Sequence, residues 1–334
     1  MHNGKNIRTD LAIEAQEFIK EQSFKDTGAQ TENIPGVEVQ TEGEKDIKVT
    51  RVRILNDEGE KAIGKPKGHY ITLEIARLNE SDQDLYEDSC RALAKEINNI
   101  INIDKKATVL IAGLGNWKVT PDSLGPKVIS NIMVTRHLIE YVPEQIDDRV
   151  RPVCAVSPGV LGITGVETGE IIKGIVEKIK PDLIIAIDSL ASRKMDRVNK
   201  TIQISDTGIS PGSGVGNKRM ELSEKTMGVP VVAIGIPTVV DAATMANDTI
   251  ELVIDNLIKH SDKESDFYKM LKELDSTSKY QLIQEVLNPY VGNLIVTPKE
   301  IDEIVKKIAL VVSNGINIAL HEGVQLDDVN RYLN

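Results

Sequence analysis

The sequence predicts an α/β fold in which a mostly parallel sheet carries helices on both faces, as in phosphorylase/hydrolase-like proteins. From about residue 80 onward, short aliphatic runs alternate with segments of helical periodicity. Two of these runs, Leu183–Ile187 and Val231–Ile236, contain no polar side chain. Solid apolar strands are typical of parallel sheets that are covered on both sides. An N-terminal β-ribbon at about residues 45–80 is expected to precede this alternation.

The individual elements follow from hydrophobic periodicity and from helix start and stop signals. In the N-terminal third we expect helix 11–21, a loop or loosely attached strand at 25–44, and strands 47–54 and 68–75 joined by a turn at 56–59. The later elements are expected in this order: helix 84–101, strand 107–112, helix 122–137, strand 151–156, a helix ending at Pro181, strand 183–187, strand 201–204, strand 231–236, helix 241–258 and a helix ending near 320. Capping boxes at 164–167 and 297–300 are expected to open two of the helices, and residues 259–279 to form a polar surface excursion.

Length and composition narrow the function classes. The chain has 334 residues, of which 40% are hydrophobic, and residues 11–334 are expected to form a single domain. No run approaches the roughly 18 apolar residues of a membrane span, and no signal peptide is visible, so a cytoplasmic protein without a membrane partner is expected. A net charge of −11 argues against direct binding of nucleic acid. The two cysteines, Cys90 and Cys154, are expected as buried or half-buried thiols.

Two aspartates are the candidate catalytic residues. Asp188 follows the apolar run 183–187, and Asp122 lies at the start of the helix expected after strand 107–112. Ligands of open α/β sheets bind outside the carboxyl ends of the strands, where both side chains are expected. Two carboxylates in one crevice share a proton and can supply a base and an acid at once. Either aspartate taken alone is equally consistent with a cap, Asp122 of its helix and Asp188 of the turn after its strand.

Other motifs in the sequence are weaker indications of function. Gly113-Leu114-Gly115 lacks the third glycine of a dinucleotide fingerprint, because Lys118 stands there, and we expect these glycines to let the backbone approach a substrate strand. Asp206-Thr207-Gly208 occurs once, which favours a turn over a pepsin-like site. The five histidines include none between residues 138 and 259, so a serine triad lacks an obvious base, and His137 is assigned to the end of a helix. No metal-ligand cluster or cofactor motif is visible, and we expect neither a metal nor a cofactor.

Longer segments of the chain resemble the germination protease family. The segments that carry the resemblance span nearly the whole chain: Arg8–Ala12, Gly113–Asn116 with Thr120–Asp122, Arg136–Leu138, Pro158–Val160, Ala186–Asp188, Pro211–Arg219, Ile234–Ala242 and Asn293–Glu300. The resemblance implies a spore endopeptidase that digests small acid-soluble spore proteins in the spore core. It also implies a homotetramer, and a zymogen that removes its own N-terminal propeptide.

The resemblance further implies a fold shared with hydrogenase maturation proteases, in which an acidic pair and a histidine bind nickel. The acidic positions correspond to Asp122 and Asp188, but the histidine has no counterpart here, which argues against nickel. The propeptide is expected to be residues 1–10, with cleavage between Asp10 and Leu11, since Asp10-Leu11-Ala12 repeats the acidic–apolar–alanine pattern of the substrates. Two alternatives stay open: a non-catalytic peptide-binding protein and a metal-dependent maturation-type protease.

Overall fold

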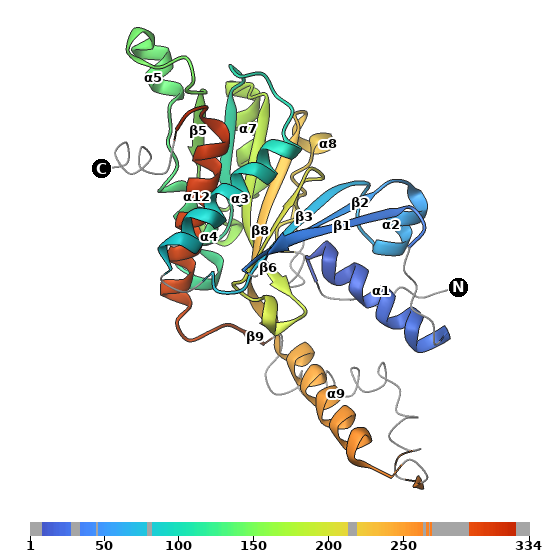
Figure 1. Cartoon of the computed structure of the whole chain (residues 1–334). Helices are drawn as coiled ribbons and strands as arrows, with labels where there is room; N and C mark the ends of the chain where they lie inside the picture. Colours follow the sequence, from blue (N-terminus) through green and yellow to red (C-terminus); the bar gives the residue numbers. More distant parts are fainter. Residues whose placement is uncertain are drawn as a thin grey trace.

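The computed structural model describes residues 9–27, 34–44, 46–78, 82–212, 219–262, 265–266, 268 and 294–324. These residues form an α/β structure around one sheet with the strand order β1-β2-β3-β7-β8-β6-β4-β5, and β9 pairs with β8 (Figure 1). The strands are β1 (Val37–Glu44), β2 (Ile47–Ile54), β3 (Gly68–Ile75), β4 (Val109–Gly113), β5 (Val153–Val156), β6 (Leu183–Ser192), β7 (Thr201–Ser205), β8 (Val231–Asp241) and β9 (Ile295–Val296).

The sheet is mixed, so the prediction of a mostly parallel sheet is wrong in that respect. Strands β5, β4, β6 and β8 are parallel, whereas β7, β3, β2, β1 and β9 each join by antiparallel pairing. The N-terminal ribbon is confirmed and is larger than expected, because β1 adds a third strand. The ribbon also extends the main sheet, since β3 pairs with β7. Apolar runs indicate burial on both faces but do not specify strand direction, which explains the error.

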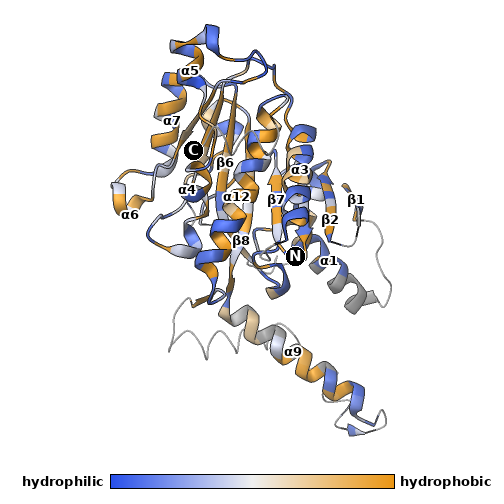
Figure 2. Cartoon of the chain, turned by 60° about the vertical axis from the view of Figure 1, so that its left-hand side comes forward, coloured by the Kyte–Doolittle hydropathy of each residue, from blue (hydrophilic) through white to orange (hydrophobic). Residues whose placement is uncertain are grey.

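Helices cover both faces of the sheet, as expected (Figures 1 and 2). One face packs against α3 (Gln83–Ile100), α4 (Leu124–Ile129) and α12 (Ile301–Leu320), which share the largest hydrophobic core. The opposite face packs against α7 (Thr168–Ile179) and α8 (Glu224–Met227). Helices α1 (Ala12–Thr27) and α2 (Asp57–Ile63) pack on β2 and β3. Helix α9 (Ala242–His260) extends away from the body in Figure 1. Shorter elements are α5 (Arg136–Tyr141), α6 (Leu161–Thr164) and the 3₁₀ turns η1 (Thr120–Asp122), η2 (Pro143–Gln145) and η3 (Met195–Arg197).

Alternation along β6 determines which face carries the site. Ile185 and Ile187 point into the core under α3 and α12, whereas Ile184 and Ala186 point into the core under α7. Because side chains of a strand alternate between faces, Asp188 lies on the α7 side. The chemistry predicted for Asp188 therefore belongs to that side of the sheet.

Several predicted boundaries need correction. The helix expected at 122–137 is divided into η1, α4 and α5, and His137 lies in the first turn of α5 rather than at a helix end. The turn expected at 56–59 is the start of α2, where the Asn56 side chain accepts hydrogen bonds from two amides. Neither expected capping box forms: α7 has Glu167 at its N-cap without a side-chain hydrogen bond, and the Thr297 hydroxyl donates to the Thr238 carbonyl.

The remaining strand and helix predictions agree to within a few residues, except that α1 runs about six residues further and β6 and β8 each about five. Most of the expected excursion at 259–279, residues 28–33 of the expected loop, and residues 213–218 of Pro211–Arg219 lie outside the described residues.

Candidate functional site

Asp188 lies at the point where one strand of the sheet ends and its neighbour continues. Strand β4 ends at Gly113, opposite Ile187, while β6 continues to pair with β8 as far as Ser192. Asp188 is therefore the first residue of β6 beyond the end of β4. The sequence had suggested that Asp188 ends its strand, but the strand continues beyond it. Asp188 does not cap a turn either. Its side chain is 5% exposed and accepts a hydrogen bond from the Ser189 amide at 2.9 Å.

Asp122 approaches from the loop after β4. It is the last residue of η1, and its Oδ2 accepts a hydrogen bond from the Asn116 amide at 2.8 Å. The N-cap of α4 is Ser123, so the alternative that Asp122 caps this helix is wrong. Its backbone carbonyl also accepts from the Asn116 amide, at 2.9 Å. Together these contacts fold residues 116–122 into a closed loop that presents the carboxylate.

The two aspartates line one cavity of about 390 Å³, as predicted. Burial raises the pKa of Asp122 to about 6, although the hydrogen bond from Asn116 opposes the shift. Burial and then the negative charge of Asp122 raise the pKa of Asp188 well above its usual value, and the hydrogen bond from the Ser189 amide lowers it. A buried carboxyl group whose pKa is raised by a half-buried neighbouring carboxylate favours sharing one proton, held on the deeper residue, Asp188. This arrangement offers a base and an acid in one cavity.

Gly113 and Gly115, at and just after the end of β4, allow close contacts within the chain. A Cβ on Gly113 would lie 2.4 Å from the Gly125 carbonyl oxygen, so Gly113 lets α4 close onto β4. Gly115 has a φ of +106°, and a Cβ there would lie 2.1 Å from the Asp122 carbonyl oxygen and 3.1 Å from its Oδ1. Gly115 therefore admits the loop that carries Asp122, and the expected approach of a substrate strand stays a prediction.

The N-terminal segment reaches the same cavity. Asp10 lines it, donates its amide to the Ala191 carbonyl at 3.2 Å, and accepts from the Ala191 amide at 3.0 Å through its own carboxylate. Its negative charge further raises the pKa of Asp188. The next residue, Leu11, is 0% exposed and packs with Leu190 of β6. The bond singled out from the sequence, Asp10–Leu11, thus lies beside the aspartate pair.

Acidic side chains of α1 fasten this segment to the body. Glu14 accepts hydrogen bonds from the Arg193 amide at 2.7 Å and the Lys194 amide at 3.0 Å, and Thr9 donates its hydroxyl to it. Glu17 accepts two hydrogen bonds from Arg197, at 3.0 and 2.6 Å. The sequence indicated a polar tail before a helix, but no local signal placed it in the site. These contacts join residues about 180 positions apart.

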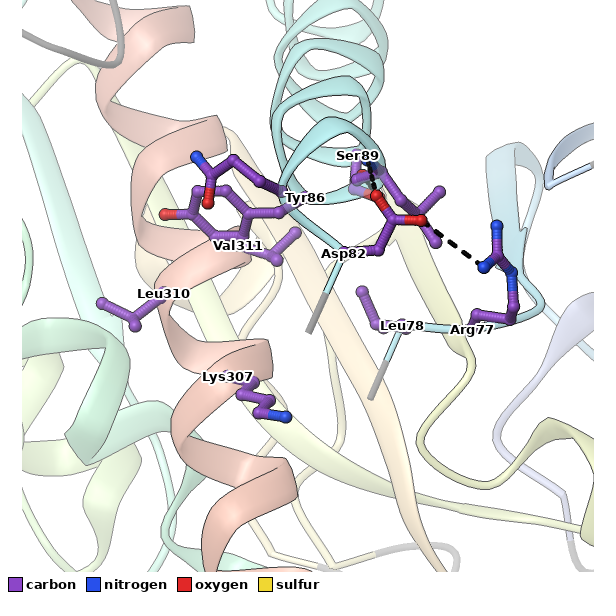
Figure 3. Close-up of a pocket in the computed structure, with 10 residues that line it drawn as sticks. Arg77, Leu78, Asp82, Tyr86, Ser89, Lys307, Leu310 and Val311 are labelled. Atoms are coloured by element: carbon purple, nitrogen blue, oxygen red, sulfur yellow. Dashed lines mark hydrogen bonds and ion pairs between the residues drawn. The ribbon is translucent and has the colours of Figure 1, made fainter. Parts of the chain in front are cut away.

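A second cavity of about 390 Å³ lies between α3 and α12 (Figure 3). Arg77 forms an ion pair with Asp82 at its rim, and Tyr86 and Val311 form part of its wall. It has no lining residue in common with the aspartate cavity. In the cavity between α3 and α12 the Asp82 carboxylate is paired with Arg77, whereas the aspartate cavity holds two carboxyl groups of raised pKa, so the aspartate cavity is the candidate active site.

The other sequence motifs have structural roles. Asp206 accepts hydrogen bonds from the amide and from Nδ1 of His69, and Gly208 has a φ of +83°, as expected of a turn. Cys90 is buried and Cys154 half-buried, as predicted. Within the described ranges, no three His, Cys, Asp or Glu residues are grouped so as to hold a metal ion. Among the helices that the structure describes, none has the length and apolar character to cross a membrane.

Comparison with known proteins identifies the family. The family model for germination protease matches residues 12–266 and 255–333. The germination protease of Clostridium tetani is 57% identical over 329 residues, covering 98% of this chain and 100% of that one. That of Clostridium acetobutylicum is 56% identical over 333 residues, covering 98% and 99% of the two chains.

A more distant solved structure is also similar in part. It is the [NiFe] hydrogenase maturation protease HycI from Thermococcus kodakarensis, with 21% identity and a TM-score of 0.29 over 42% of this chain and 80% of that one. The family model and the full-length relatives, by contrast, account for nearly every residue of the chain. The chain belongs to the germination protease family.

Proposed function

We propose that this chain, an endopeptidase of the germination protease family, starts the degradation of small acid-soluble spore proteins with Asp122 and Asp188 as its catalytic pair. The observation that carries the proposal is the pair itself, two carboxyl groups in one cavity with both pKa values raised. Paired carboxylates of unequal pKa divide the roles of base and acid. Both positions were also identified from the sequence.

The raised pKa values assign the roles. Asp122, with a pKa of about 6, is the group that ionises first near neutral pH. It takes a proton from a water molecule whose oxygen forms a bond to the carbonyl carbon of the substrate. Asp188 retains its proton because of its burial and the charge of Asp122, and it donates that proton to the leaving nitrogen as the C–N bond breaks.

The same pair is proposed to mature the chain. Residues 1–10 are the propeptide, residues 11–334 the protease domain, and the bond cut is Asp10–Leu11. Support comes from the docking of Asp10 at the cavity that both aspartates line. A bond held beside the catalytic groups has no translational entropy left to lose before reaction. Residues 1–8 lie outside the described residues.

The wider setting follows from the family. The relatives bear the name germination protease, which supports spore proteins as substrates and the spore core as the place of action. A homotetramer is proposed on the family resemblance. No direct contact with nucleic acid or a membrane is included in the proposal.

The test is the mass of the chain before and after incubation under mildly acidic, dehydrating conditions. We expect the N-terminus to move from Met1 to Leu11, and the processed protein then to cut a purified small acid-soluble spore protein. A chain that gains activity while still starting at Met1 contradicts the propeptide assignment. A processed chain that binds the spore protein without cutting it indicates the peptide-binding alternative. Inhibition by a chelator, reversed by one divalent ion, indicates the metal-dependent alternative.

Gly115→Ala is expected to lower cleavage by about 100-fold or more, because a methyl group there displaces the Asp122 backbone, and misplacement by about 1 Å has that effect. Gly228→Ala is the matched control: its φ is +80°, but a Cβ there meets nothing within 4 Å. The control reports the cost of the backbone conformation alone. Equal rates in the two variants would show that the position of Asp122 does not limit cleavage.

A further inference from the structure

The carbonyl oxygen of Asp10 is held by two side chains. Lys65 Nζ donates to it at 2.9 Å, and Gln203 Nε2 donates to it at 3.1 Å. This oxygen belongs to the peptide bond between Asp10 and Leu11, which is the bond proposed to be cut. Neither donor was singled out from the sequence.

The two donors come from two different parts of the chain. Lys65 follows Gly64, the left-handed residue that ends α2, and Gln203 lies on β7. Gln203 also accepts from the Ala12 amide at 2.7 Å through Oε1. One amide side chain therefore fixes the backbone on both sides of Leu11, with its nitrogen on the carbonyl that precedes Leu11 and its oxygen on the amide that follows.

Asp10 lines two neighbouring cavities. Asp10 lines the aspartate cavity, and it also lines a neighbouring cavity of about 320 Å³ that includes Lys65 and Gln203. Neither Asp122 nor Asp188 lines this second cavity. The oxygen is thus bound by donors on one side while the acid–base pair is on the other, an arrangement suited to attack on the carbonyl carbon.

The ammonium group of Lys65 interacts more favourably with a negatively charged oxygen than with a neutral one. Burial lowers the pKa of Lys65, and the negative charges of Asp10 and Glu14 partly offset that effect. A buried ammonium group is incompletely compensated by a neutral carbonyl, and it interacts far more strongly with an oxyanion at low dielectric. Interactions that strengthen in the transition state are the ones that accelerate a reaction.

We propose that Lys65 and Gln203 form the oxyanion site of this protease, an inference that rests on the proposed cleavage at Asp10–Leu11. When water adds to the Asp10 carbonyl carbon, the π electron pair moves to the oxygen, which is bound by the ammonium and the amide. The proton of the water goes to Asp122. The C–N bond then breaks as the oxyanion re-forms a carbonyl, and Leu11 nitrogen takes the proton of Asp188. The products are the Asp10 carboxyl group and the Leu11 amine.

Two variants remove the donors without removing the segment. Lys65→Met eliminates the ammonium and keeps the aliphatic stem. Gln203→Glu keeps an oxygen that can accept from the Ala12 amide but loses the donor to Asp10. Loss of one oxyanion donor lowers a rate by about 100- to 1,000-fold. Lys67→Met is the matched control, because this exposed lysine, two residues further along the chain, forms an ion pair with the surface residue Asp57.

The readouts are the first-order rate of self-cleavage and the hydrogen-exchange protection of the Ala12 and Ala15 amides, which report docking of the segment. Measurements use the full chain. We expect both variants to cut at least about 100-fold more slowly with protection unchanged, and Lys67→Met to match the parent. Slow cutting together with lost protection would mean that Lys65 and Gln203 only dock the segment, and an unchanged rate would exclude both roles.

Asp122→Asn, assayed in parallel, separates this inference from the proposed function. If the parent chain is not cut at Asp10–Leu11, or Asp122→Asn is cut at the parent rate, the proposed function fails. If those two results are as expected while Lys65→Met is cut normally, only the oxyanion site is overturned.

Discussion

Replacing Asp122 or Asp188 by asparagine will abolish cleavage of both the spore-protein substrate and the chain's own Asp10–Leu11 bond. An amide has nearly the volume of the carboxyl group but neither accepts nor donates the proton that the reaction requires. Loss of one acid or base lowers rates by about 100- to 10,000-fold. Rates are to be measured by mass spectrometry of the intact chain and of the substrate.

The fold of these variants should survive, because neither carboxylate forms an ion pair within the part of the chain that the structure describes. Each one accepts a single backbone amide among the hydrogen bonds described, and an amide oxygen can accept the same bond. Asp122→Asn removes the charge of the pair and Asp188→Asn replaces a neutral group, so the midpoint of thermal unfolding is expected to stay unchanged or rise. Near-normal turnover by either folded variant would exclude that residue from the mechanism.

Arg197→Met will detach the N-terminal segment. The Arg197 side chain is 8% exposed and forms ion pairs with Glu14, Glu17 and Glu74, at 3.8, 2.6 and 3.2 Å. Without it, the buried Glu14 loses this counter-charge, whereas the half-buried Glu17 and Glu74 keep ion pairs with Lys194 and Lys48. Removing one partner of a buried ion pair costs about 3–5 kcal/mol. We expect a loss of this size in the free energy of unfolding, measured with denaturant, and faster proteolysis within residues 9–17.

Arg91→Met is its control, since Arg91 also forms ion pairs with carboxylates, those of Glu87 and Asp88, but its side chain is 62% exposed. Exposed pairs contribute about 0.2–1 kcal/mol. A similar loss in both variants would mean that the Arg197 network is not what holds the segment. Self-cleavage should fall in Arg197→Met and stay normal in Arg91→Met.

The sequence predicted that the two aspartates lie at one edge of the sheet, because their positions depend on local patterns. An apolar run followed by Asp188 indicates a buried strand that carries an acid near the edge of a sheet, whatever the direction of its neighbours. What failed was the extent of the strand: β6 continues past Asp188 because β8 pairs with it, and sequence periodicity contains no information on that pairing. The capping-box prediction at 297–300 failed for a similar reason, because the Thr297 hydroxyl donates its hydrogen bond to the carbonyl of Thr238, which is distant in sequence.

Residues that act through long-range contacts could not be found in this way. Lys65 and Gln203 are 55 and 193 positions from Asp10 along the chain, and neither lies in a recognisable motif. The mixed sheet is a related case, because antiparallel pairing of β3 with β7 joins segments more than 120 residues apart in sequence. In both cases the information lies in how the elements meet, not in any one of them.

Docking of residues 9–17 sets up a competition for the cavity. A segment tethered to its own binding site acts at an effective concentration on the order of millimolar. A free spore protein making equal contacts would have to approach that concentration to displace it, so the uncut chain should be silent toward substrates. Cleavage at Asp10–Leu11 is expected to weaken the competition from the docked segment in two ways. The fragment that ends at Asp10 becomes free to diffuse away, while Leu11 acquires an α-amino group, whose pKa is about 7.7–8.0, at a position where its side chain is 0% exposed. Desolvation of that new charge opposes the burial of Leu11. The cut is therefore also expected to weaken the docking of the residues from Leu11 onward, which stay attached to the chain.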